Sequence, residues 1–196
     1  MAVPFDALKT KVKYVGVFDL KDFYRNIRDL LQDKGYVSSE SYKFMETYYQ
    51  ERVNPDPKRG KEMWIWWRTS KAEERTTYVR QHCDVDFHMR FIHDIEVMDK
   101  GKKVRAQKGE IEINFHGYIV LDPDDAWEKH WFLKQIHPLF YERIWAKRRE
   151  TNINTVRNDV YKFQQYVKDY LGLKQFGATT FPFYPTAPLP PEGRLA

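Results

Sequence analysis

The sequence predicts an α+β fold in which a curved antiparallel β-sheet of about five to six strands packs against a long C-terminal helix. Two observations lead to this prediction. Through much of the stretch 61–121, apolar residues alternate with polar ones, which is the period of strands with one buried face. After Pro123 the apolar spacing becomes helical and remains so up to Gly172. We therefore expect one domain over residues 1–171 and an extended arm over residues 172–196.

The first part of the chain predicts a strand, a helix and a hairpin. Residues 11–18 contain valine and tyrosine in partial alternation, which indicates a strand. One helix follows, because Asp19 is a suitable N-cap and apolar residues recur at helical spacing until Gly35. The segment 41–53 fits both periods, and we interpret it as a strand. Residues 54–60, NPDPKRG, have the turn chemistry to join that strand to the next one.

Two runs of the central stretch show the alternation most clearly. Polar residues alternate with their apolar ones, and we expect Glu110 and Glu112 on the solvated face. Turn signals at residues 99–103 and 108–109 are expected to separate short strands of an antiparallel meander. The expected inward-facing residues are Val85, Phe87, Met89, Phe91, Ile111, Ile113, Phe115, Ile119 and Leu121.

The C-terminal part of the domain predicts one or two long helices. Residues 127–150 are rich in helix formers, and Pro138 marks either a helix start or a kink. An apolar stripe follows at helical spacing and ends at Gly172, which predicts a helix that closes the sheet. The stripe consists of Ile153, Val156, Val160, Phe163, Val167 and Leu171.

This order of elements resembles the helix-grip, START-like superfamily over roughly residues 8–171. In that superfamily the sheet and the long helix can enclose a cavity for a hydrophobic ligand. The alternative is that the same positions form a solid core, because a fold does not by itself imply a function. The resemblance implies a cavity lined by Phe87, Met89, Ile113, Phe115, Val160 and Phe163.

Composition narrows the class of protein. A chain of 196 residues with 42% hydrophobic residues can form one packed core, which excludes disorder for most of its length. Cys83 is the single cysteine, which excludes an intramolecular disulfide and favours a reducing compartment. No stretch approaches the roughly 20 apolar residues of a membrane span. We expect no membrane partner, and a location in the cytoplasm or in a virion assembled there.

The charge balance is weakly basic. The net charge of +5 is compatible with acidic partners, but 28 acidic residues dilute the positive field. We interpret this charge as a contribution to solubility.

The motifs of common enzymes are absent from the sequence. It contains no HExxH, GxSxG, CxxC or glycine-rich phosphate loop, so we expect no enzymatic activity and no cofactor. The strongest alternative is that Asp86 and His88, on one strand face, meet His116 from a nearby strand. Such a group would bind a metal ion or share a proton. A solvated antiparallel sheet needs an alternating polar face in any case, so we expect no metal site.

The segment 58–68, KRGKEMWIWWR, combines tryptophans with cations. On a strand, Trp64 and Trp66 share one face, while the opposite face carries Ile65 and Trp67. At least one tryptophan is therefore expected at an interface. Contact with another protein is one interpretation, and stacking of nucleic-acid bases beside phosphate-binding cations is the other. The candidate nucleic-acid contacts are Lys58, Arg59, Lys61 and Arg68.

The C-terminal arm is the most informative segment for function. It contains five prolines and aromatic rings that an extended chain cannot bury by itself, so the rings need a surface supplied by the domain or by a partner. We expect a non-enzymatic structural or interaction protein of a larger assembly, such as a virion component or a ribosome-associated factor. It would bind protein partners or form a homo-oligomer. The alternatives are a binder of a hydrophobic small molecule and a nucleic-acid-binding module. The expected partner-binding residues are Phe176, Phe181, Phe183, Tyr184, Trp64 and Trp66.

Overall fold

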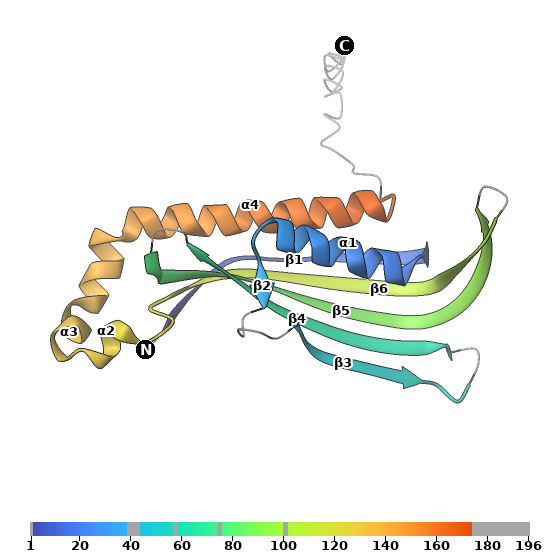
Figure 1. The fold of residues 1–196 in the computed structure, drawn as a ribbon, viewed down its shortest axis with the longest axis horizontal. Helices are drawn as coiled ribbons and strands as arrows, with labels where there is room; N and C mark the ends of the chain where they lie inside the picture. The colour runs from blue at the N-terminus through green and yellow to red at the C-terminus, as the bar shows by residue number, and fades with distance from the viewer. Residues whose placement is uncertain (1, 39–43, 57–58, 74–75, 100–101, 174–196) are drawn as a thin grey trace, which may run out of the picture.

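The chain folds into one open antiparallel sheet with its two longest helices on one face (Figure 1), which confirms the predicted α+β class. The structure is a computed structural model that describes residues 2–38, 44–56, 59–73, 76–99 and 102–173. The strands are β1 (Val3–Phe18), β2 (Val37–Ser38), β3 (Glu46–Val53), β4 (Lys61–Glu73), β5 (Thr76–Asp99) and β6 (Lys102–Leu121). The helices are α1 (Leu20–Asp33), α2 (Ala126–Lys129), α3 (Trp131–Leu139), the π-helix η2 (Phe140–Ile144) and α4 (Ala146–Tyr170).

The strands are arranged in the order β1-β6-β5-β4, and β2 and β3 both pair with the remaining edge of β4. The hairpin expected over residues 54–60 is confirmed, because β3 and β4 pair antiparallel on either side of it. The segment 41–53 forms a strand from Glu46 onward. β1 begins at Val3, eight residues earlier than expected, and pairs with β6 over almost its whole length.

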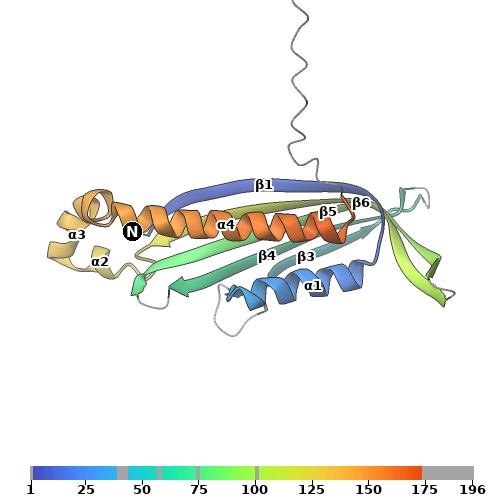
Figure 2. The same ribbon diagram turned by 90° about the horizontal axis from the view of Figure 1, so that it is seen from above.

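Helices α1 and α4 lie side by side on one face of the sheet (Figures 1 and 2). Asp19 caps α1 by accepting a hydrogen bond from the Asp22 amide at 3.0 Å, as expected. Gly35 follows the helix with a φ of 81°, a conformation that glycine adopts without strain. Below the helices, one continuous core fills the space between them and the sheet. The opposite face of the sheet, which we call the outer face, carries no described helix.

The helical stripe on α4 is confirmed, and α4 packs directly on the backbone of β6. Val156, Val160, Phe163 and Val167 are buried. A Cβ atom at Gly117 would lie 2.7 Å from a methyl carbon of Val160 and 2.8 Å from one of Val156. Gly117 therefore lets the helix approach the strand closely.

The alternation predicted for β5 and β6 is confirmed at every position except Phe91. This side chain is 55% exposed, because β5 bulges between Arg90 and His93 and Phe91 adopts a φ of 56°. The expected turn at residues 108–109 is wrong, since β6 continues through it. Gly109 instead accommodates the bulge: a Cβ atom there would lie 2.9 Å from the carbonyl oxygens of Arg90 and Phe91.

Residues 127–150, expected to be helical with a start or a kink at Pro138, are divided among α2, α3, η2 and the start of α4. Pro138 lies inside α3 and removes a backbone donor, and the π-helical turn η2 follows directly. We call residues 126–144 the helical lobe. It projects from the N-terminal end of α4, beside the start of β1 (Figure 1).

Candidate interaction surfaces

The outer face carries stacked rings as well as charges. Trp66 and Tyr48 lie at its β3 side and remain 39% and 36% exposed. As expected, Trp64 and Trp66 share this face, while Ile65 and Trp67 are buried on the other. Rings that remain partly open to solvent on a sheet face are typical of protein contact surfaces. Three pairs stack, namely Tyr48–Trp66, Trp64–His88 and His82–Tyr118, with ring centroids 4.3, 5.2 and 4.8 Å apart.

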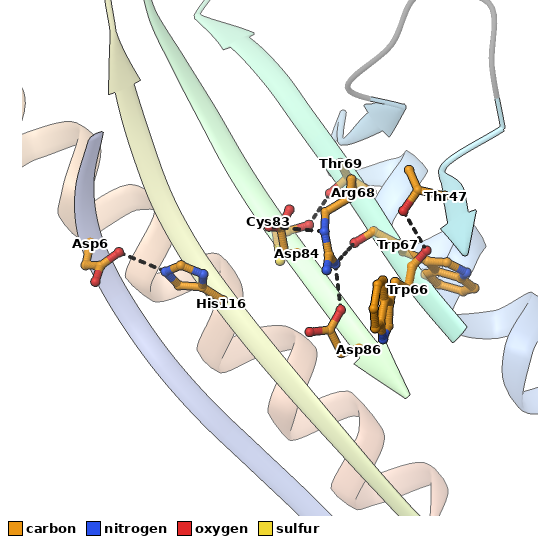
Figure 3. Close-up of polar contacts among 10 residues, drawn as sticks. All are labelled: Asp6, Thr47, Trp66, Trp67, Arg68, Thr69, Cys83, Asp84, Asp86 and His116. Carbon is orange, nitrogen blue, oxygen red and sulfur yellow. Dashed lines mark hydrogen bonds and ion pairs between the residues drawn. The ribbon is translucent and has the colours of Figure 1, made fainter. Parts of the chain in front are cut away.

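Arg68 is at the centre of this face and binds two carboxylates from β5 (Figure 3). Its Nη1 lies 2.6 Å from Asp86 Oδ1, its Nε lies 3.6 Å from Asp84 Oδ2, and its guanidinium lies 5.7 Å from the Trp66 ring centroid. Burial raises the pKa of Asp84 to about 6, although Arg68 acts in the opposite direction. The guanidinium is thus fully engaged within the protein.

The acidic and histidine residues of the outer face do not converge. A metal or proton-sharing group was only the alternative expectation. The strand register gives Asp86, His88 and His116 each a different partner. Within the described ranges, no cluster of three His, Cys, Asp or Glu side chains has the arrangement of a metal site. The partners are Arg68 for Asp86, Glu62 for His88 and Asp6 for His116, at 2.6, 2.9 and 2.8 Å.

Glu110 and Glu112, which were expected to be exposed, are largely buried, with 16% and 20% of their side-chain surface exposed. Glu110 lies 3.0 Å from Lys13 on β1 and also pairs with Arg90, and Glu112 lies 3.4 Å from Lys11. The cause is that β6 runs between β1 and β5, so its polar side chains have cations on both sides.

The cations predicted to contact a nucleic acid do not form one group in the structure. Lys61 lies 3.3 Å from Asp94 and 3.5 Å from Glu51, so its charge is balanced, as is that of Arg68. Arg59 lies in a separate pocket at the end of the outer face. Lys58 lies outside the described residues. Trp64 and Trp66 therefore have few free cations beside them, which weakens the argument for phosphate binding there.

The six residues of the expected ligand cavity are packed side chains of the core. Each is at most 2% exposed, and the rings of Phe87 and Phe163 meet those of Phe23 and Tyr36 edge-on at 6.5 and 5.7 Å. Edge-on ring contacts between fully buried side chains are typical of a packed core. A more open apolar cleft of about 640 Å³ lies elsewhere, between α1 and the sheet. It is lined by Leu20, Tyr24, Tyr49, Met63 and Ile65, among others.

The helical lobe carries the two most exposed of the large apolar side chains that the structure describes. Trp131 is 76% exposed and Ile144 is 72% exposed, and Phe132 and Leu139 are about half exposed. Exposed apolar side chains of this size mark interaction sites when they gather on one element. The sequence analysis did not identify them. The available signal was that residues 127–150 contain more apolar residues than a single buried helical stripe requires.

The lobe is firmly anchored, so this exposure does not result from loose packing. Asp122 accepts hydrogen bonds from the Ala126 and Trp127 amides at 2.8 and 3.0 Å. The Tyr78 hydroxyl is 2.8 Å from His137 Nε2. The Tyr78 ring also contacts Trp127, Phe140 and Trp145.

The four aromatic residues predicted as anchors in the arm, Phe176, Phe181, Phe183 and Tyr184, lie outside the described residues. The described chain ends at Leu173, at the end of α4 remote from the helical lobe (Figure 1).

Comparisons with known proteins leave the family open. No protein-family model matches the chain, and no curated protein matches it. Among solved structures, an uncharacterized protein from Rhizobium leguminosarum aligns with the chain at 5% sequence identity. That alignment has a TM-score of 0.17 and covers 79% of this chain and 99% of the other. Among the described helices, none combines the length and hydropathy of a membrane span.

Proposed function

We propose that this protein is a non-enzymatic component of an assembly, in which the C-terminal arm of one copy binds the helical lobe of a second copy. The observation that supports this is the exposure of Trp131, Phe132, Leu139 and Ile144 on a lobe that hydrogen bonds anchor to the domain. The arm supplies complementary chemistry, because its rings alternate with prolines that hold an extended chain. A virion shell repeats one chain many times, and such an exchange of arms suits it.

The length of the arm favours binding to the lobe of a second copy over binding to the chain's own lobe. Tyr184, the last aromatic anchor, is 11 residues beyond Leu173 and reaches about 34 Å in a polyproline II conformation. Helix α4, with 25 residues, is itself about 37 Å long, and the lobe lies beyond its far end. A chain that docks on its own lobe would therefore leave its anchors short of the apolar residues.

The proposal is tested by size-exclusion chromatography with light scattering over a range of concentrations. We expect full-length protein to form oligomers, and both truncation after Leu173 and Trp131→Ser to produce monomers. A synthetic peptide of residues 174–196 should bind the truncated protein and fail to bind it when Trp131→Ser is added. Tyr161→Ser is the matched control, because Tyr161 is an exposed aromatic residue on α4 away from the lobe. Oligomers that persist without the arm would contradict the proposal.

A second candidate function is binding of a hydrophobic small molecule, which is supported by the cleft of about 640 Å³ beside α1. Met63→Trp should fill this cleft and displace such a ligand. Native mass spectrometry of freshly purified protein would show a retained ligand whose mass is lost in the variant. If neither the wild type nor Met63→Trp retains a ligand, the result would contradict this second candidate function.

A further inference from the structure

A pocket of about 420 Å³ lies at one end of the outer face, where the β3–β4 hairpin meets the bulge in β5. Three arginines line it: Arg52 from β3, Arg59 from the hairpin and Arg90 from β5. The exposed ring of Phe91 forms another wall. This pocket lies on a different part of the molecule from the helical lobe.

The described residues leave an excess of positive charge in this pocket. Within the described part of the chain, the guanidinium groups of Arg52 and Arg59 make no hydrogen bond or ion pair. Arg90 pairs with Glu110, yet its Nε is buried without a hydrogen-bond partner among the described residues. The one acidic wall residue, Glu62, is paired with His88 at 2.9 Å. Two arginine charges therefore remain for a ligand.

The backbone fixes the shape of this pocket. The Asn54 amide donates a hydrogen bond to the Gly60 carbonyl at 3.2 Å, which closes the base of the hairpin. Gly60 has a φ of 60°, and a Cβ atom there would lie 2.6 Å from the Ile92 carbonyl oxygen. Phe91 is held at a positive φ that bulky residues rarely adopt. Strained backbone of this kind gathers at ligand sites, where the surrounding structure maintains it.

We propose that this pocket binds the phosphate group of a small aromatic phosphate monoester, of which a nucleoside monophosphate is the simplest example. A phosphate monoester carries a charge of about −1.5 to −2 at pH 7, which matches the two unpaired guanidinium groups. A carboxylate would balance only one of them. Arginine binds phosphate oxygens through two parallel hydrogen bonds, and the Phe91 ring offers a stacking surface for the aromatic group.

The test is isothermal titration calorimetry at low salt with adenosine monophosphate, adenosine and inorganic phosphate as probes. We expect adenosine monophosphate to bind at least ten-fold more tightly than either of the others, because only it engages both the arginines and Phe91. Arg59→Glu should abolish this binding. Phe91→Leu should weaken binding of adenosine monophosphate about ten-fold and leave inorganic phosphate unchanged.

Lys162→Glu is the matched control, since it makes the same change of charge on α4, on the other side of the sheet. Circular dichroism melting of each variant checks that it is folded. No heat from any probe at millimolar concentration, or binding that survives Arg59→Glu, would overturn the proposal. Binding of a single-stranded oligonucleotide without binding of adenosine monophosphate would also overturn it, in favour of a nucleic-acid contact.

Discussion

Two titratable side chains on the outer face respond to burial in opposite ways. Burial raises the pKa of Asp84 to about 6 and lowers the pKa of His82 to about 4. In both cases burial favours the neutral form, because the charged form loses hydration. As pH rises from about 4 to 6, Asp84 reduces stability, because in this range the unfolded chain loses a proton that the folded protein keeps. His82 increases stability over nearly the same window, because only the unfolded chain keeps its proton.

Asp84→Asn should isolate the effect of Asp84. The amide needs no ionisation, so the variant should be more stable than the wild type above pH 6, and the difference should disappear near pH 4. A shift of about two pKa units sets an upper bound of about 3 kcal/mol, and partial solvation reduces the expected gain to about 1 kcal/mol. Arg68 keeps its partner Asp86 at 2.6 Å. Urea unfolding between pH 4 and 7.5 measures this, and a difference independent of pH would contradict it.

Phe163→Ala should show whether the core is solid. The side chain is 1% exposed and meets the Tyr36 ring edge-on, so its removal leaves a cavity among packed neighbours. We expect a loss of about 3 to 5 kcal/mol in the free energy of unfolding. The control is Tyr161→Ala, an exposed aromatic residue on the same helix and away from the proposed interface, where the loss should stay within about 0.5 kcal/mol. A mild loss at Phe163 would instead indicate that it borders a ligand cavity.

At the scale of the elements, the contact of α4 with Gly117 determines how closely the helix approaches the sheet. Gly117→Ala should cost about 1 to 3 kcal/mol, because the added methyl group meets Val156 and Val160 at less than 3 Å. Val156→Ala removes one of these contacts. In a double-mutant cycle, the two changes together should therefore cost less than the sum of the single costs. Additive costs in urea unfolding would mean that the helix shifts freely.

The elements were predictable where a single period dominates the sequence. The stripe on α4 and the inward residues of β6 follow from spacing alone, because burial is their only constraint. Gly109 shows where prediction from spacing fails. A glycine in the sequence is compatible with a turn and with a close backbone contact, and only the pairing of β5 with β6 distinguishes the two. The bulge that exposes Phe91 depends on the same pairing.

The candidate surfaces were less predictable than the elements that carry them. Trp66 was identified because two tryptophans on alternate faces cannot both be buried in a one-sided core. The ion pairs of Arg68 and the arginine pocket depend on strand register, which spacing does not supply. Trp131 was missed because exposure in a broken helix depends on how Pro138 and the π-turn redirect the chain.

At the scale of the whole molecule, the fold buries one side of the sheet and leaves the other to solvent. The outer face tolerates this because most of its charges form pairs across strands and its rings stack on one another. Among the described residues, Trp131 and Ile144 of the helical lobe remain 76% and 72% exposed. In the proposed assembly, the arm of a second copy would cover them.

Truncation after Leu173 should therefore leave the domain fully folded. Val167 and Leu171 close this end of the core against α1 and the sheet, and Leu173, which the truncation keeps, packs on the same core. Loss of an oligomer by itself lowers a melting midpoint, so the wild type is not a fair reference. Full-length Trp131→Ser is the appropriate reference, because this variant and the truncated protein are both expected to be monomers. Circular dichroism melting should give the same midpoint for the two within about 2 °C, since a change of 1 kcal/mol shifts the midpoint by about 2 to 4 °C in a domain of this size. A midpoint well below that reference would show that the arm braces its own domain, and the assembly role would lose its main support.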